Sequence, residues 1–234
     1  MIKEALQYLV ELGNKKIQVG DKVYSTEPLH LVSDPTPSVI EVNSLSGLVD
    51  YVLSGFDGKK QFLIHVASPT HVFVHGALRE DKARECYVKA QAIVPDFLFG
   101  KWYDPETFNI KLQSCFVPNE DRDIMLKVVG NIKEEHVNTY GDDGVSQAVT
   151  AKVGVATVAK VKVPNPVVLK PYRTFVEVDQ PESNFVFRMR SGPECALFGA
   201  DGGAWRLEAI KRIKEYLQKE LQSMIDEGLV TIIA

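Results

Sequence analysis

The polar cluster with the clearest binding chemistry is the segment 171–175, Pro-Tyr-Arg-Thr-Phe, with two further arginines downstream. Aromatic rings can stack on nucleobases, and a guanidinium can donate two parallel hydrogen bonds to a phosphate or carboxylate. If the strands expected on either side of the 179–184 turn pair, Arg173 and Arg190 come together at the open end, with Arg188 on the same face as Arg190. The candidate ligand-binding residues are therefore Tyr172, Arg173, Thr174, Phe175, Arg188 and Arg190.

These arginines have a structural alternative. Glu177, Asp179 and Glu182 lie close to them in the sequence. Surface ion pairs between such residues are common and weak. The sequence leaves both interpretations open.

Three histidines, His65, His71 and His75, fall within one eleven-residue segment. A metal site needs their nitrogens about 2 Å from one ion. On one strand His71 and His75 share a face, but their Cα atoms are about 13 Å apart at 3.3 Å per residue. His65 can approach only one of them across a hairpin, so we expect histidines on a polar strand face and no metal site.

The glycine-rich segment 199–203, Gly-Ala-Asp-Gly-Gly, precedes a helical pattern and is similar to a phosphate-binding turn. It lacks the GxGxxG and GxxxxGK[ST] spacings, and Asp201 places a negative charge at the opening. The simpler interpretation is a tight strand-to-helix turn with Asp201 close to the helix N-cap.

Patterns typical of catalysis are missing, since GxSxG, HExxH and SxxK do not occur. Cys86, Cys115 and Cys195 are widely spaced and odd in number, which fits free thiols in a reducing compartment better than a disulfide framework or a zinc site. Acidic pairs such as Asp142 and Asp143 lie in loop-like sequence. We therefore expect no catalytic residues, no cofactor and no enzymatic activity.

Composition excludes several classes of protein. The 234 residues are 45% hydrophobic and 25% charged, as in ordinary globular domains. The net charge of −4 disfavours binding of bulk duplex DNA but leaves a local basic patch open. The N-terminal segment has acids among its apolar residues, unlike a signal peptide, and no apolar run approaches the ~18 residues of a membrane span. We expect a soluble, cytoplasmic protein that does not bind membranes.

The elements that position these residues follow from periodicity. The organising segment is 145–190, where valines and alanines alternate with small or polar residues as in strands, after a turn at 139–144. Amphipathic spacing predicts helices at 2–12, 44–56, 104–116, 119–129 and 205–227. Alternation and turn residues predict strands within 16–31 and at 61–67, 71–75, 83–94, 173–178, 185–190, 195–198 and 229–233.

The predicted fold class is α+β, because strands cluster instead of alternating with helices. We expect mixed, mostly antiparallel sheets, a short N-terminal helix and a long C-terminal amphipathic helix. The expected division is an N-terminal α+β region at 1–130 and a C-terminal β-rich region with the terminal helix at 131–234. One integrated domain is the alternative.

Three segments carry a resemblance to a known family: YGDDGVSQAVTAKVG, PYRTFVEVDQPESNFVFRMR and CALFGADGGAWRLEAIKRIKEYL. Together they resemble the YfdQ-like family of uncharacterised phage and prophage proteins, over 140–217 and more loosely in FGKWYDPETF. The resemblance implies a phage accessory protein and brings no catalytic residues.

Three functions remain. The first is a non-enzymatic phage protein in the host cytoplasm that binds a small anionic, nucleotide-type ligand and so sequesters a host immune signal. The second is an accessory factor of recombination or replication that binds single-stranded DNA, although the net charge disfavours nucleic acid. The third is a structural or assembly protein without a ligand. We expect a homo-oligomer, since the C-terminal strand and helix offer self-complementary surfaces.

Overall fold

The computed structural model describes residues 2–13, 16–20, 22–25, 35–58, 60–80, 82–130, 139–142, 147–153, 157–162, 165–190, 192 and 194–234. The chain divides into two units, Met1–Thr36 and Pro37–Ala234. This division differs from the expected one at 130, and the two hydrophobic cores of the second unit both draw on residues from either side of that position. The fold class is α+β with mixed sheets, as predicted.

The first unit holds a helix and a hairpin. The amphipathic helix α1 (Ile2–Gly13) is the expected short N-terminal helix, and β1 (Lys16–Val19) pairs antiparallel with β2 (Lys22–Ser25). Gly20 has a φ of 64° at the turn, a left-handed conformation that glycine adopts without steric cost. The hairpin predicted around this glycine is confirmed.

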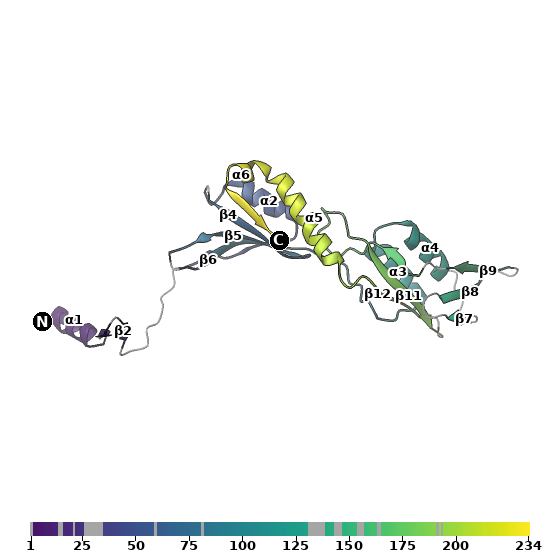
Figure 1. Ribbon diagram of the computed structural model, residues 1–234, viewed down its shortest axis with the longest axis horizontal. Helices are drawn as coiled ribbons and strands as arrows, with labels where there is room; N and C mark the ends of the chain where they lie inside the picture. The colour runs from purple at the N-terminus through teal and green to yellow at the C-terminus, as the bar shows by residue number, and fades with distance from the viewer. Residues whose placement is uncertain are drawn as a thin grey trace. The chain divides into compact units, whose positions relative to one another are not determined.

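A five-stranded sheet forms the centre of one half of the second unit (Figure 1). Its strand order is β13-β4-β5-β6-β3, in which β4 (Phe62–Ser68), β5 (His71–Leu78) and β6 (Arg84–Gln91) are antiparallel. The edge strands β3 (Ile40–Val42) and β13 (Val230–Ile233) run parallel to β6 and β4. The predicted hairpin is therefore confirmed, and the C-terminal strand joins the parent sheet.

Helices cover one face of this sheet: α2 (Leu45–Ser54), α5 (Trp205–Glu220) and α6 (Gln222–Asp226) all lie on the same side in Figure 1. Alternate strand residues point toward them, because successive side chains of a strand point to opposite faces. The buried strand residues of this first core are Phe62, Ile64, Val66, Val72, Val74, Tyr87, Val88, Ala90 and Val230. None of the described helices is long and apolar enough to cross a membrane.

The predicted long C-terminal helix is interrupted at Leu221. That residue leaves the helical conformation with φ −110° and ψ 17°, and its side chain is fully buried. Beyond the break, Met224 and Ile225 pack against the first core beside β13. Apolar residues recur at helical spacing on both sides of Leu221, so periodicity alone does not reveal the break.

The other half of the second unit has its own core. There α3 (Pro105–Cys115) and α4 (Glu120–Gly130) pack with an antiparallel sheet of β10 (Val167–Leu169), β11 (Ser183–Arg190) and β12 (Glu194–Gly199). Aromatic rings dominate this second core, as the aromatic-dense sequence around α3 indicates.

Helix α3 begins as predicted. Asp104 is its N-cap and accepts a hydrogen bond from the backbone N–H of Thr107 at 2.9 Å, with Pro105 in the first turn. Two of its apolar residues, Phe108 and Leu112, are fully buried, and Cys115 is nearly so. The sequence alone predicts this helix because the cap and its hydrogen-bond partner lie within its first turn, and its apolar residues all face one core.

A third antiparallel sheet has the order β7-β8-β9, with β7 (Thr139–Asp142), β8 (Gln147–Val153) and β9 (Thr157–Lys162). The turn predicted at 139–144 is wrong for its first four residues, which form β7. Thr139 pairs with Val149, and Thr and Tyr side chains favour strands. The last two residues of that predicted turn lie outside the described part of the chain.

The segment 170–182, here called the connector, is not the strand predicted at 173–178. Its backbone groups bond instead to the buried side-chain amide of Gln180. The amide oxygen accepts from the N–H groups of Arg173 (2.9 Å) and Thr174 (3.2 Å). The amide nitrogen donates to the carbonyls of Phe175 (3.0 Å) and Val178 (3.2 Å). These groups are thereby unavailable to a sheet ladder, and the chain turns back on itself.

The connector also anchors itself to the first core. Its residues Phe175 and Val178 are buried in that core, and the Thr174 hydroxyl donates to the carbonyl of Pro69 at 2.5 Å. The Glu177 carboxylate accepts from the backbone N–H of Leu45 at 2.7 Å. It thereby places a negative charge at the positive end of α2.

We expect Glu177→Ala to lower the free energy of unfolding by about 1 kcal/mol, because it removes a charged cap from a helix N-terminus. Urea denaturation measures the change. Glu182→Ala is the matched control, since its exposed carboxylate forms a surface ion pair with Lys170, at 3.2 Å. Equal effects of the two variants would contradict a capping role for Glu177.

Candidate ligand-binding face

The predicted site residues 172–175 lie in the connector, where most of them have structural partners. Thr174 and Phe175 are each 1% exposed, so neither side chain can reach a ligand without unfolding of the connector. Tyr172 is half-buried, and its backbone N–H donates to the carbonyl of Cys115 at 2.9 Å.

Arg173 lies at the centre of a small polar network. Its Nη2 donates to the Ser183 hydroxyl at 2.5 Å, and that hydroxyl donates to Asp201 Oδ2 at 2.5 Å. The guanidinium also stacks on the Trp205 ring, 4.0 Å from its centroid. The pKa of Arg173 is lowered to about 10, chiefly by burial; the nearby Asp201 charge opposes this shift and the Arg206 charge adds to it. The network joins the connector to β11 and to the start of α5.

Arg190 lies at the other end of β11 and has its own partner. Its Nε and Nη2 both lie 2.6 Å from Glu194 Oε2, and its guanidinium lies over the Trp102 ring at 4.5 Å. Arg188 shares the face of Arg190, as predicted, because the buried residues of β11 occupy the alternate positions.

The structure does not bring Arg173 and Arg190 together, and the expected pairing of 173–178 with 185–190 is wrong. Strand β11 pairs with β10 and β12 instead. Ser183, the partner of Arg173, and Arg190 are the first and last residues of β11, about 23 Å apart at 3.3 Å per residue. Arg190 does form an ion pair, but with Glu194 and not with the acids considered from the sequence.

A cavity of about 560 Å³ adjoins the Arg173 network. Its charged lining residues are Glu182, Asp201, Glu208 and Lys211. Three carboxylates against one ammonium give this cavity the wrong sign for an anionic ligand. The half-buried Arg173 guanidinium offsets part of this charge, but it already donates to the Ser183 hydroxyl.

The glycine-rich segment is a tight strand-to-helix turn, as predicted. The Asp201 carboxylate accepts from the N–H of Gly203 at 3.0 Å, and Gly202 and Gly203 have φ values of 62° and 83°. These left-handed conformations explain the glycine pair. The turn leads directly into α5 at Trp205.

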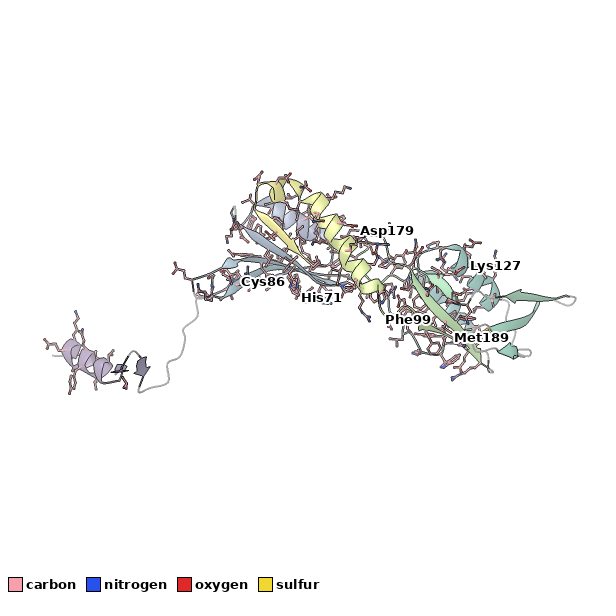
Figure 2. The ribbon with its side chains drawn as sticks, viewed as in Figure 1. His71, Cys86, Phe99, Lys127, Asp179 and Met189 are labelled. Atoms are coloured by element: carbon pink, nitrogen blue, oxygen red, sulfur yellow. The ribbon has the colours of Figure 1, made fainter. Side chains whose placement is uncertain are left out.

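The face of the five-stranded sheet that points away from α2 and α5 is here called the open face. Figure 2 shows the labelled His71 and Cys86 along this side. Strand alternation and pairing place on it Leu63, His65, His71, Phe73, His75, Cys86, Lys89, Gln91, Thr231 and Ile233. Most of these side chains are half-buried by one another and remain in contact with solvent.

Four rings form a ladder on the open face. Along β5, the centroids of His71 and Phe73 are 6.4 Å apart and those of Phe73 and His75 are 5.9 Å apart, with ring planes 17° and 23° from parallel. His65 on β4 lies opposite Phe73, with centroids 6.5 Å apart, and Lys89 lies opposite Phe73 on the other side. Phe73 is therefore at the centre of the ladder.

The histidines do not converge on a metal position. The His65 and His75 ring centroids are 6.4 Å apart. Among the described residues no group of three or more His, Cys, Asp and Glu side chains could hold a metal ion. The Cys86 thiol lies beside His75 across the strands, and burial raises its pKa, which disfavours the reactive thiolate.

Sequence reasoning placed His71 and His75 on one strand face but missed Phe73 between them. The signal was the alternation His-Val-Phe-Val-His, in which the two valines fill the covered face and the three rings necessarily share the other. The charge on this face is modest, because the ammonium of Lys89 pairs with Glu41 at 3.1 Å.

Comparison of the chain with models of protein families, with curated proteins and with solved structures gives no match. The resemblance to the YfdQ-like family stays a prediction.

We expect Arg173→Ala to lower the free energy of unfolding by about 2 kcal/mol, because it removes a charged hydrogen bond and the contact with Trp205. Arg190→Ala, which removes an exposed ion pair, should cost less than about 1 kcal/mol. Thermal and urea denaturation measure both. An unchanged stability in Arg173→Ala would restore this arginine as a candidate ligand-binding residue.

The pKa of His75 is lowered by burial first, and then by the nearby charges of His65 and Arg84. Its unfolded form, with a pKa of about 6.5, binds more protons than the folded form in mildly acidic solution. Stability should therefore be complete above about pH 7 and decrease as the pH falls toward 5. Urea denaturation across this range should show a smaller decrease in His75→Gln, and an identical pH dependence would contradict the assignment.

Proposed function

We propose that this protein is a non-enzymatic binding protein that holds single-stranded nucleic acid on the open face. The observation that carries the proposal is the ladder of His71, Phe73 and His75 with His65 beside it. Bases stack on aromatic side chains irrespective of sequence, and each stacked base contributes about 1–3 kcal/mol. A sheet with one helix-covered face and one ring-bearing face provides such a platform.

The arrangement of the rings favours a strand over a single nucleotide. Three rings follow one line along β5, so consecutive bases can each find a ring, whereas one base occupies only part of the ladder. Mononucleotide sites are concave, and no ring of the ladder lines the cavity of about 410 Å³ that borders this face at Leu63 and Thr231. Gln91, opposite His71, can hydrogen-bond a base edge at the end of this line.

The charges near the ladder support binding dominated by stacking. Lys89 and Arg84 are the described cations of β6, and Lys89 is already paired with Glu41. Each phosphate neutralised on a single strand contributes a slope of about −0.7 to log K against log salt. We therefore expect a shallow salt dependence, which agrees with the net charge of −4.

The functions expected from the sequence, binding of a small anionic ligand and a role as a phage accessory protein, remain predictions alongside this proposal. A small anionic, nucleotide-type ligand would need an anion site, and the cavity beside Arg173 is lined by more carboxylates than cations. A role as a phage accessory protein, in the host cytoplasm and against host defence, rests on the sequence resemblance alone. A strand-binding function is compatible with such a role.

Phe73→Ala tests the proposal. Fluorescence anisotropy with a labelled mixed-sequence DNA single strand should show affinity reduced about 10- to 100-fold, since the central stacking surface is lost. Phe56→Ala is the matched control, because that ring is 87% exposed and lies in the turn after α2, away from the ladder. Its affinity should equal that of the wild type.

Length and salt series complete this test. Affinity should rise with oligonucleotide length until the ladder is covered, and it should fall only gently with salt. Equal binding by Phe73→Ala and the wild type would contradict the proposal. Saturation by a single mononucleotide per chain would replace it with the small-ligand function.

A further inference from the structure

The two edges of the five-stranded sheet differ in how they are protected. An unpaired edge strand invites another strand, and proteins commonly protect such edges with short length, proline or charge. The β3 edge has all three, because it has three residues, contains Glu41 and follows Pro37 closely. The β13 edge is also short, at four residues, but it lacks the other two protections, since residues 228–234, Gly-Leu-Val-Thr-Ile-Ile-Ala, contain neither a charged side chain nor a proline.

The direction of the β13 backbone groups follows from one hydrogen bond. The Phe62 N–H donates to the Leu229 carbonyl at 2.8 Å, so Leu229 faces β4. Successive residues of a strand direct their N–H and C=O groups to opposite sides, so Thr231 also faces β4. Val230 and Ile232 therefore direct their N–H and C=O groups to the outer edge, where no described strand lies.

We propose that β13 pairs antiparallel with β13 of a second copy of this chain across a two-fold axis at Thr231. In this register Val230 lies opposite Ile232 of the second copy, and the outward N–H and C=O groups of both residues are satisfied. Thr231 then faces its own counterpart in a non-hydrogen-bonded pair, with Cα atoms about 4.5 Å apart. The helix-covered faces of the two sheets then lie on the same side of the joined sheet. This is required because Val230 and Ile232 of each copy pack against the first core.

A second copy fits this edge better than an unrelated strand for a reason in the sequence. The register pairs β-branched residues with each other and threonine with threonine, which are favourable cross-strand neighbours. The absence of charged side chains means that the strand does not repel itself. The two open faces would join into one continuous surface, although the pairing itself does not depend on what that surface binds.

Charge substitution at Thr231 tests the pairing. Thr231 is exposed on the open face, so Thr231→Lys and Thr231→Glu should each fold like the wild type by circular dichroism and melting temperature. Each variant should be monomeric by sedimentation velocity at concentrations where the wild type is dimeric, because like charges meet at the axis. An equimolar mixture of the two variants should restore the dimer.

The outcomes are separate from those for nucleic-acid binding, because sedimentation is measured without nucleic acid. A monomeric wild type at every concentration overturns the proposal. So does a dimer in both charge variants, or a mixture that stays monomeric while both variants are folded. Thr231→Ser serves as the neutral control and should remain dimeric.

Discussion

The fold of the second unit depends on the side-chain amide of Gln180. This one buried group bonds to four backbone groups of the connector and fixes it as a turn between the two cores. The turn places Phe175 in the first core and the Glu177 carboxylate at the start of α2. An unmade hydrogen bond at a buried amide costs about 1–3 kcal/mol, so the complete set of partners matters more than any single bond. Arg212 reinforces the turn by donating to the Gln180 carbonyl.

The residues with binding chemistry therefore fall into two groups: those that hold parts of the protein together, and those on the open face that are accessible to a ligand. The arginines and aromatic residues around the connector already have partners within the protein, and their chemistry is used in holding elements together. The open face differs, because the helices that cover the sheet lie on its other side and leave the rings accessible. A surface that carries four rings and little charge supports binding through stacking more than through ion pairs.

Sequence reasoning succeeded where the deciding partners are local. The caps at Ser44 and Asp104 lie three residues from their partners, and the helices that follow were predicted correctly. It failed at 173–178. The alternation of residues there does not show that the side-chain amide of Gln180 forms hydrogen bonds with the backbone groups of this segment. The prediction that Arg173 lies near Arg190 failed for the same reason, because it assumed that 173–178 is a strand. The ladder is predictable from the alternation around Phe73, but a metal site involves only the histidines and gives this phenylalanine no role.

The most direct test of the account is a titration of the protein with a short DNA single strand, followed by the ring resonances in NMR spectra. Stacking of bases on the open face predicts that signals of Phe73, His71 and His75 shift first, while those of Trp102 and Trp205 stay unchanged. Shifts at Trp205 without shifts at Phe73 would place the ligand beside Arg173 instead. That result would contradict the assignment of the open face as the binding surface.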